Sequence, residues 1–423
     1  MLKSKIFMVL LIVVTLLMLL VPACGKEKEN TPVPTATPVV TATPMGTAIL
    51  TPTPMVTPTA TPTSSPVPGG PVKIGAITSW SGPLALAGVS LADPIIKLVE
   101  KQVKDQGGIL GGREVKVVRY DNRGTVAEAV AGADKLFRED EVSALVFGGV
   151  SSTEAAGVAG FAEKNQILFV AYGTLEKPAE NKFTISATMG ARPHFTNAIV
   201  DLAIKVLKPK TVAIMGFDLW ENHDRFQAYR EGFEAAGIKV VSEQYTPFDL
   251  SDYSPYLTRV KYANPDMLVL DYPPSEPYLS IGKQMMELGG WGDMKVVGLP
   301  GAETAKRLPG VDGMYFISLW FPGDTYPGSV KFETEYKAMN KGATPSSTQV
   351  YYYNCLWTVI YAIELAGTTD RVAIGQAARS GNLEWDSPMG HAHYTLEQEG
   401  YPGLTPKILR LEGGKSVLVT IPE

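Results

Sequence analysis

The sequence predicts an α/β protein with two doubly wound lobes, each built on a parallel sheet. Residues 71–423 have an ordinary globular composition and, at 353 residues, are too many for one compact core. Short apolar runs alternate there with segments of helical periodicity, and this alternation occurs in two series, before and after residue 190. Strands connected through helices form parallel sheets that are covered on both faces.

The N-terminal residues 1–23 are typical of an export signal. Lys3 and Lys5 precede an uncharged apolar run over 6–20, which is shorter than the roughly 20 residues of a spanning helix. The small residues before Cys24 resemble the lipobox of bacterial lipoproteins. This resemblance implies a lipidated Cys24 and an extracytoplasmic protein held at the cell membrane. The alternative is an uncleaved anchor helix with an incidental cysteine.

Residues 24–70 are predicted to form a Thr/Pro-rich tether. The stretch 31–70 contains 12 threonines and 10 prolines. Proline lacks a backbone donor and fixes φ, so this composition favours extended polyproline II structure and cannot pack a core. At ~3.1 Å per residue the stretch would span on the order of 120 Å when fully extended.

The first series of elements occupies residues 72–170. Short, mainly apolar runs predict strands at 72–77, 115–120, 144–147 and 167–170. Apolar residues spaced by three and four predict helices at 89–106, 125–137 and 152–165. The glycine-rich stretch 107–112 follows a helix rather than a strand, so it is predicted to be a helix end and turn.

The second series follows the same alternation. Strands are predicted at 211–215, 239–244, 267–270 and 295–298. Helices are predicted at 193–207, 225–236, 253–262 and 278–288. Ligands of such sheets bind outside the carboxyl ends of the strands, so two lobes that face each other there would enclose a binding cleft.

Composition and motifs exclude several classes of function. The chain has 38 basic and 43 acidic residues, a net charge of −5, which argues against a nucleic-acid binder. His391 and His393 alternate in a predicted strand without a metal-binding pattern around them, and Cys355 lies on an apolar helix. The stretch 413–416 resembles the end of a P-loop, but Leu409 replaces its first glycine. We therefore expect no catalytic residue, no metal and no cofactor.

Several stretches, in order and spacing, resemble the branched-chain amino acid (Leu/Ile/Val) binding proteins, which are type I periplasmic solute-binding proteins of ABC importers. These stretches are 74–76, 81–85, 107–115, 120–122 and 147–152. The resemblance implies lobes joined by a three-segment hinge near 189–192, 318–323 and 382–388. Lobe one would comprise 71–190 and 321–381, and lobe two 191–320 and 382–423.

The start of the predicted helix at 152 is a candidate ligand site. Ser151 and Glu154 have the spacing of a capping box, and the free N–H groups of a helix start suit a carboxylate. The resemblance implies that Ser152 binds the ligand carboxylate, with Ser151 and Thr153 beside it. The alternative is that these residues only cap the helix.

The resemblance implies five further contacts. Thr174 matches a threonine near the ligand, and Tyr172 replaces a small residue that would line the pocket. On lobe two, Trp220 would cover the ligand, and Glu276 would neutralise its ammonium group, with Tyr272 as a second candidate. Thr174 could also be a helix cap, and Glu276 a solvated loop residue.

The leading hypothesis is a lipid-anchored receptor that binds a small amino acid, amide or related carboxylate between its lobes and delivers it to an ABC permease. A sensory binding module without a transport role is the first alternative. An amide hydrolase is the second, although no pair of nucleophile and base is apparent in the sequence.

Overall fold

The computed structural model describes most of the chain from residue 69 onward. The described ranges are 69–82, 85, 87–149, 152–173, 180–187, 193–247, 250–272, 277–299, 310, 312–395 and 402–422. The predicted signal segment 1–23, Cys24 and all of the predicted tether except residues 69 and 70 lie outside these ranges.

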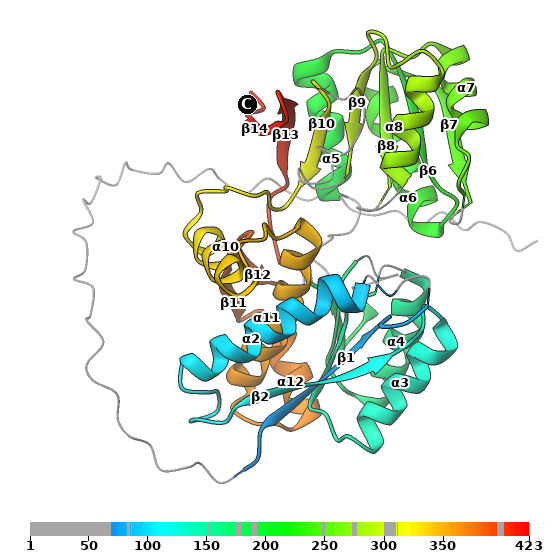
Figure 1. Ribbon diagram of the computed structural model, residues 1–423. Helices are drawn as coiled ribbons and strands as arrows, with labels where there is room; N and C mark the ends of the chain where they lie inside the picture. Colours follow the sequence, from blue (N-terminus) through cyan, green and yellow to red (C-terminus); the bar gives the residue numbers. More distant parts are fainter. Residues whose placement is uncertain are drawn as a thin grey trace, which may run out of the picture. The chain divides into compact units, whose positions relative to one another are not determined.

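The first sheet has five parallel strands in the order β2-β1-β3-β4-β5. Figure 1 shows its neighbouring strands β1 and β2 side by side. Its strands are β1 (Val72–Thr78), β2 (Val115–Asp121), β3 (Ala144–Phe147), β4 (Phe169–Ala171) and β5 (Thr184–Ser186). The three central strands are almost wholly buried, which is why their sequences are mainly apolar.

Helices cover both faces of this sheet. The helices that follow its strands are α2 (Asp93–Asp105), which continues the π-helix η1 (Ala87–Ala92), α3 (Val126–Arg138) and α4 (Ser152–Asn165). Successive residues of β1 point to opposite faces, so Ala76 packs in the core on the α2 side and Ile77 in the core on the side of α3 and α4. The helix α3 begins where the Thr125 side chain accepts a hydrogen bond from the Glu128 N–H at 3.2 Å.

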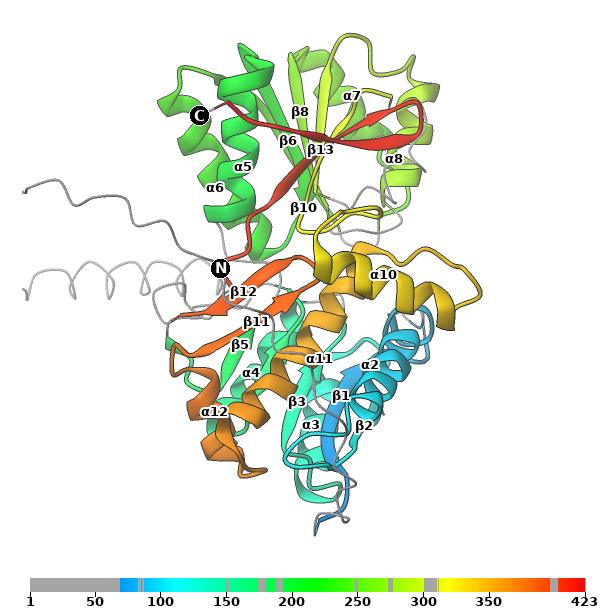
Figure 2. The same cartoon turned by 90° about the vertical axis from the view of Figure 1, so that its left-hand side faces the viewer.

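The second sheet has seven strands in the order β14-β13-β10-β9-β8-β6-β7. They are β6 (Thr211–Phe217), β7 (Lys239–Thr246), β8 (Met267–Asp271), β9 (Lys295–Gly298), β10 (Tyr315–Ser318), β13 (Lys407–Glu412) and β14 (Lys415–Val419). The strands from β10 to β7 are parallel, whereas β13 and β14 add an antiparallel hairpin beside β10 (Figure 2). Gly413 and Gly414, with φ of 54° and 75°, form the tight turn of this hairpin, so the glycines that resemble a P-loop have a structural role.

Two pairs of helices cover the second sheet. On one face lie α5 (Pro193–Asp201), extended by the π-helix η3 (Leu202–Leu207), and α6 (Trp220–Ala235). On the other face lie α7 (Ser254–Ala263) and α8 (Pro277–Glu287). The strand β6 again alternates, with Ile214 in the core of α6 and Met215 in the core of α7 and α8.

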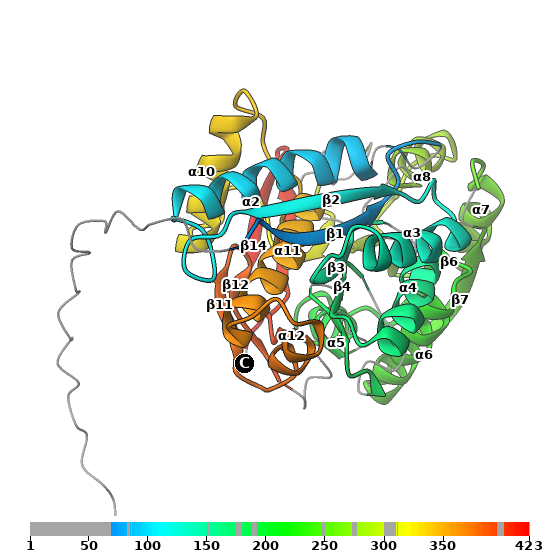
Figure 3. The ribbon, with the colours of Figure 1, turned by 90° about the horizontal axis from the view of Figure 1, so that it is seen from below.

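A third group of elements packs against the first sheet. It comprises α10 (Pro327–Met339), α11 (Ser347–Ala366), α12 (Arg371–Ala378) and the hairpin of β11 (Leu383–Ser387) and β12 (Gly390–Tyr394). The helix α11 contacts α2, β3 and β4, and Figure 3 shows α2 and α11 on the face of the first sheet opposite to α3 and α4. The strand β11 contacts α10 and α11.

The predicted strands and helices of both series are confirmed, with boundaries that shift by a few residues. The largest shift is at α6, which begins at Trp220 and not at 225, because its first turn is polar and shows no apolar periodicity. The segment 382–423, which we expected in lobe two, is divided. Only 407–419 joins the second sheet, while the hairpin 383–394 packs on α10 and α11. The chain therefore joins the second sheet only at β13, after the predicted hinge segment 382–388.

Candidate functional site

Polar residues gather where the strands of both sheets end. In the first sheet, Ser79 and Asn122 follow β1 and β2, and in the second sheet Asp271 ends β8. All three residues are at most 1% exposed. The carboxyl ends of parallel strands are the usual ligand-binding edge of such sheets, so buried polar groups at this edge are candidates for a binding site.

A chain of hydrogen bonds runs along this edge of the first sheet. The Ser79 hydroxyl donates to Asn122 Oδ1 at 2.8 Å, and Asn122 Nδ2 donates to Glu154 Oε2 at 2.5 Å. Burial raises the pKa of Glu154, and the hydrogen bond from Asn122 partly offsets this effect. These contacts hold the first turn of α4 against the ends of β1 and β2. Ser151 lies outside the described residues, so its predicted capping box with Glu154 stays a prediction.

Ser152 is the first residue of α4, and its hydroxyl donates to Glu221 Oε1 at 2.7 Å. Glu221 lies in the first turn of α6, which follows β6, and it is 8% exposed. This hydrogen bond therefore joins the strand ends of the first sheet to the strand ends of the second. Thr153, the neighbour of Ser152, is exposed.

Behind Glu221, the edge of the second sheet contains a buried ion pair. Arg225 Nη2 donates to Asp271 Oδ1 at 2.6 Å, and Arg225 Nε donates to Oδ2 at 2.9 Å. Burial opposes the charge of Arg225, but the Asp271 carboxylate outweighs it and the pKa of Arg225 is raised. Asn222 Nδ2 also donates to Asp271 Oδ1, at 3.1 Å. Gly216 allows this close packing, since a Cβ there would lie 2.6 Å from the Asp271 carbonyl oxygen.

The structure places the remaining predicted contacts in different surroundings. Trp220 is partly exposed, on the same helical turn as Glu221. Tyr172 is 7% exposed and stacks on Tyr351 of α11, with ring centroids 6.0 Å apart. Thr174 and Glu276 lie outside the described residues.

Tyr272 occupies the core of the second sheet and not its edge. It has no exposed surface, and its hydroxyl is 3.1 Å from Thr246 Oγ1. Its ring packs edge-on against Phe217, with centroids 4.8 Å apart, and burial raises the pKa of Tyr272. This placement gives Tyr272 a packing role, and we therefore leave it out of the candidate site.

Sequence reasoning missed Glu221. The resemblance directed attention to the acidic residue after the next strand, and Glu221 stands 69 positions away from its partner Ser152. One signal was present in the sequence, because Glu221 directly follows Trp220, which was chosen as a ligand-covering residue on the same loop.

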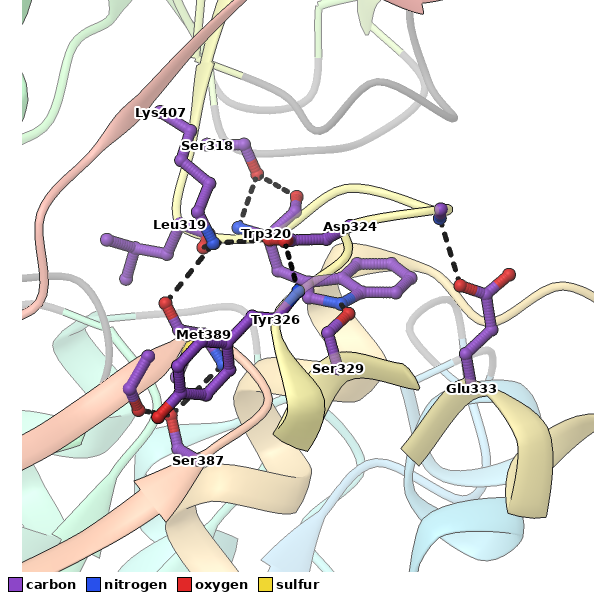
Figure 4. A network of polar contacts seen from close by, with 12 residues as sticks. Ser318, Leu319, Trp320, Asp324, Tyr326, Ser329, Glu333, Ser387, Met389 and Lys407 are labelled. Carbon is purple, nitrogen blue, oxygen red and sulfur yellow. Dashed lines mark hydrogen bonds and ion pairs between the residues drawn. The ribbon is translucent and has the colours of Figure 1, made fainter. Parts of the chain in front are cut away.

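A second polar network lies where the chain leaves the second sheet after β10 and returns to it at β13 (Figure 4). We call the stretches of chain that connect the two sheets passages; the second follows β10 and the third precedes β13. Lys407 Nζ forms an ion pair with Asp324 and donates to the carbonyl oxygens of Leu319 at 3.2 Å and of Met389 at 3.3 Å. The Asp324 side chain is only 9% exposed. Lys407 is the first residue of β13. These contacts connect it to the segment between β10 and α10 and to the turn of the hairpin β11–β12.

His391 and His393, the histidines considered as metal ligands, both have hydrogen-bond partners. His391 Nδ1 is 2.9 Å from Asp386 Oδ1 on the paired strand, and this contact raises the pKa of His391. His393 Nε2 is 2.9 Å from the Gly381 carbonyl oxygen. The acidic partner of His391 lies on the opposite strand of the hairpin, so the residues next to His391 in the sequence do not form a metal-binding pattern. No group of three or more metal ligands occurs among the described residues.

Cys355 has no exposed surface, and burial raises the pKa of its thiol, as expected for a small apolar core residue. Within the described ranges, no helix has the length and apolar character needed to cross a bilayer.

Two doubly wound α/β sheets, with polar strand ends that meet through Ser152 and Glu221, define a two-lobed binding protein. The comparison with family models agrees, because the model of the periplasmic binding protein family matches residues 71–402. The chain belongs to this family, and the fold expected from the sequence resemblance is confirmed.

Solved structures of solute-binding proteins are similar over most of the chain. The leucine-binding protein LivK from Thermotoga maritima is 21% identical, with a TM-score of 0.70 over 82% of this chain and 98% of that chain. LivJ from Streptococcus pneumoniae, in complex with isoleucine, is 20% identical, with a TM-score of 0.68 over 82% and 99% of the two chains.

A third similar structure comes from Rhodopseudomonas palustris BisB5. It is a solute-binding protein of an ABC transporter in complex with 3,4-dihydroxybenzoic acid. It is 22% identical, with a TM-score of 0.71 over 82% and 96% of the two chains. At these identities the likeness establishes the fold. No match was found among curated proteins.

Proposed function

We propose that the chain is the lipid-anchored solute-binding receptor of an ABC importer and that its ligand is a small amino acid or a related carboxylate. The observation that carries this proposal is the hydrogen bond between Ser152 and Glu221, which joins the helix starts that follow the carboxyl ends of strands in two different sheets. The family supports a binding role outside the cytoplasm. The similar structures that hold isoleucine and a benzoic acid support a ligand of this size with a carboxylate.

The N–H groups at the start of α4 suit the ligand carboxylate, with the Ser152 hydroxyl beside them. Contacts on the α6 side, from Trp220 and Glu221, would then form only when the lobes are closed. A ligand that contacts both sides shifts the equilibrium toward the closed form by its differential affinity. Closure of this kind binds and releases a solute without any chemical step.

Cys24 and the tether 24–70 supply the rest of the proposal. Acylated Cys24 would hold the protein on the outer side of a membrane, and the Thr/Pro-rich stretch would let the binding domain reach the permease. The permease would bind the closed form of the receptor, in which the surfaces of both lobes can contact it together.

The proposal is tested by thermal unfolding of the full chain with the standard amino acids, their amides, 4-hydroxybenzoate and 3,4-dihydroxybenzoate. A ligand present at 100 times its Kd stabilises the native state by about 2.7 kcal/mol, which raises the midpoint by several degrees. We expect at least one member of this panel to do so. A panel that leaves the midpoint unchanged throughout contradicts the proposal. Uptake of the bound ligand by cells with and without the chain then separates a transport receptor from a sensory module.

A further inference from the structure

Glu221 has one carboxylate oxygen that nothing in the described part of the chain satisfies. Oε1 accepts the hydrogen bond from Ser152, whereas Oε2 is buried and has no hydrogen-bond partner among the described residues. The residue is only 8% exposed. A buried acceptor without a donor is costly, so an oxygen in this position calls for a donor from outside the described structure.

The cationic side chain nearest to Glu221 in the sequence, Arg225, already forms an ion pair with Asp271. Arg225, one turn further along α6, gives both Nε and Nη2 to Asp271, and Asn222 Nδ2 also donates to that carboxylate. Asn222 Oδ1, next to Glu221 in the chain, is a second buried acceptor without a partner among the described residues. The first turn of α6 therefore contains two buried side-chain acceptors, Glu221 Oε2 and Asn222 Oδ1, that have no donor among the described residues.

The α4 side of the same contact supplies hydrogen-bond donors. Ser152 donates its hydroxyl proton, and the first turn of α4 has backbone N–H groups that point out of the helix start. Donors at the start of α4 and the unpartnered carboxylate oxygen of Glu221 match a ligand whose carboxylate and ammonium groups are attached to the same carbon. An ammonium group has three donors and no acceptor, so it suits Glu221 Oε2.

We propose that Glu221 is the specificity-determining residue of the site and that it selects ligands with an amine over carboxylic acids without one. This inference rests on the proposed function, since it assigns the ligand class of that same site. A carboxylic acid without an amine offers no donor to Glu221 and places a second negative charge near it. An α-amino acid satisfies both sides of the contact.

The substitution Glu221→Gln separates this role from a purely structural one. The glutamine Oε1 can still accept the hydrogen bond from Ser152, so a contact that only joins the two sheets is retained. Only the negative charge is lost. Glu221→Asp keeps the charge on a shorter side chain, and Glu234→Gln changes an exposed glutamate of the same helix as a matched control.

The experiment is isothermal titration of the full chain and the three variants with two sets of probes. One set is the standard amino acids, and the other contains 4-hydroxybenzoate and the carboxylic acids that lack each amino group, such as 4-methylpentanoate for leucine. We expect an amino acid to bind wild type at least tenfold more tightly than its deaminated acid. Glu221→Gln should raise the Kd of that amino acid by 10- to 100-fold and leave the Kd of the deaminated acid within threefold of the wild-type value. Glu221→Asp should recover part of the loss, and Glu234→Gln should match wild type.

The inference is overturned if Glu221→Gln, folded by circular dichroism, binds the amino acid within threefold of wild type. It is also overturned if carboxylic acids without an amine are the only ligands, and in both cases the receptor function stands. If no probe of either set binds, the proposed function fails and the inference fails with it.

Discussion

At the scale of single residues, Asp271 is a carboxylate with no exposed surface, and its charge is balanced by Arg225. Two charges taken out of water together are held by their mutual attraction and by their hydrogen bonds. When one partner is removed, the other charge is left buried without compensation. The pair also fixes Asn222, the neighbour of Glu221, so it holds the start of α6 in place.

We expect Asp271→Asn to lower the free energy of unfolding by about 3–5 kcal/mol, because the Arg225 charge stays buried. Urea denaturation at neutral pH measures this loss. The matched control is Lys283→Met, which removes an exposed partner of Glu287 at 3.9 Å and should change stability by less than about 0.5 kcal/mol. Equal effects of the two substitutions would contradict a structural role for the buried pair.

The sequence allowed only one residue of the hydrogen bond between the sheets, Ser152, to be chosen as a site residue. Ser152 could be chosen because the resemblance implies a ligand-binding serine at this position, at the start of the helix after a buried strand. Glu221 could not, because its importance comes from a partner on another sheet and from the burial of its second oxygen. Tyr272 shows the converse error, since its place after a strand gave no sign that its ring turns into the core.

At the scale of elements, α11 is the buried helix that covers the first sheet, and its ends are well defined. The Ser346 side chain accepts from the Gln349 N–H at 3.2 Å, and the Gln349 side chain accepts from the Ser346 N–H at 2.8 Å, which is a capping box. Gly367 ends the helix with φ of 64°. The Gln349 side chain also donates to the Ser90 carbonyl at 2.8 Å, so the cap ties α11 to η1.

We expect Ser346→Ala to destabilise the protein by about 1 kcal/mol, because one backbone N–H at the helix start loses its acceptor. Thermal and urea unfolding measure the change. Thr344→Ala, at an exposed position just before the cap, serves as the control and should have little effect. A loss no greater than that of the control would mean that the capping box adds nothing to the stability of α11.

Elements were predictable where the sequence has a short apolar run or a helical period, and unpredictable where it has neither. The strands β3 and β8 are short apolar runs buried on both faces, so their position followed from composition alone. The start of α6 did not, because Trp220 to Asp224 show no apolar stripe. The hairpin of β11 and β12 was placed with the wrong sheet, since nothing local specifies that it packs on α10 and α11.

At the scale of the whole molecule, the three passages between the sheets decide which segments belong together. The first predicted passage, 189–192, lies outside the described residues, and the second lies between β10 and α10. The third comes after the hairpin of β11 and β12, where Lys407 contacts Asp324 and two backbone carbonyls. The number of passages could be expected from the resemblance, whereas the third position depends on tertiary packing.

The proposed anchor makes a prediction for the whole chain. Cys24→Ser removes the acylation site, and we expect the variant to leave the membrane fraction and appear in the soluble fraction, since buried acyl chains add about 0.8 kcal/mol per CH₂. Cell fractionation with immunoblotting measures this. Cys355→Ser, at the buried cysteine, is the control and should stay with the membrane. Membrane retention of the Cys24 variant would disprove lipid anchoring.

The antiparallel hairpin at the end of the chain has a consequence for anyone who wishes to produce one half of the protein alone. The second sheet draws its strands from 211–318 and 407–419, and the insertion between them forms α10, α11, α12 and the hairpin of β11 and β12. Any fragment that stops before 407 leaves β10 with unpaired N–H and C=O groups, and open strand edges promote aggregation. An isolated half therefore requires a splice of two distant segments or a circular permutation, and simple truncation is expected to give insoluble material.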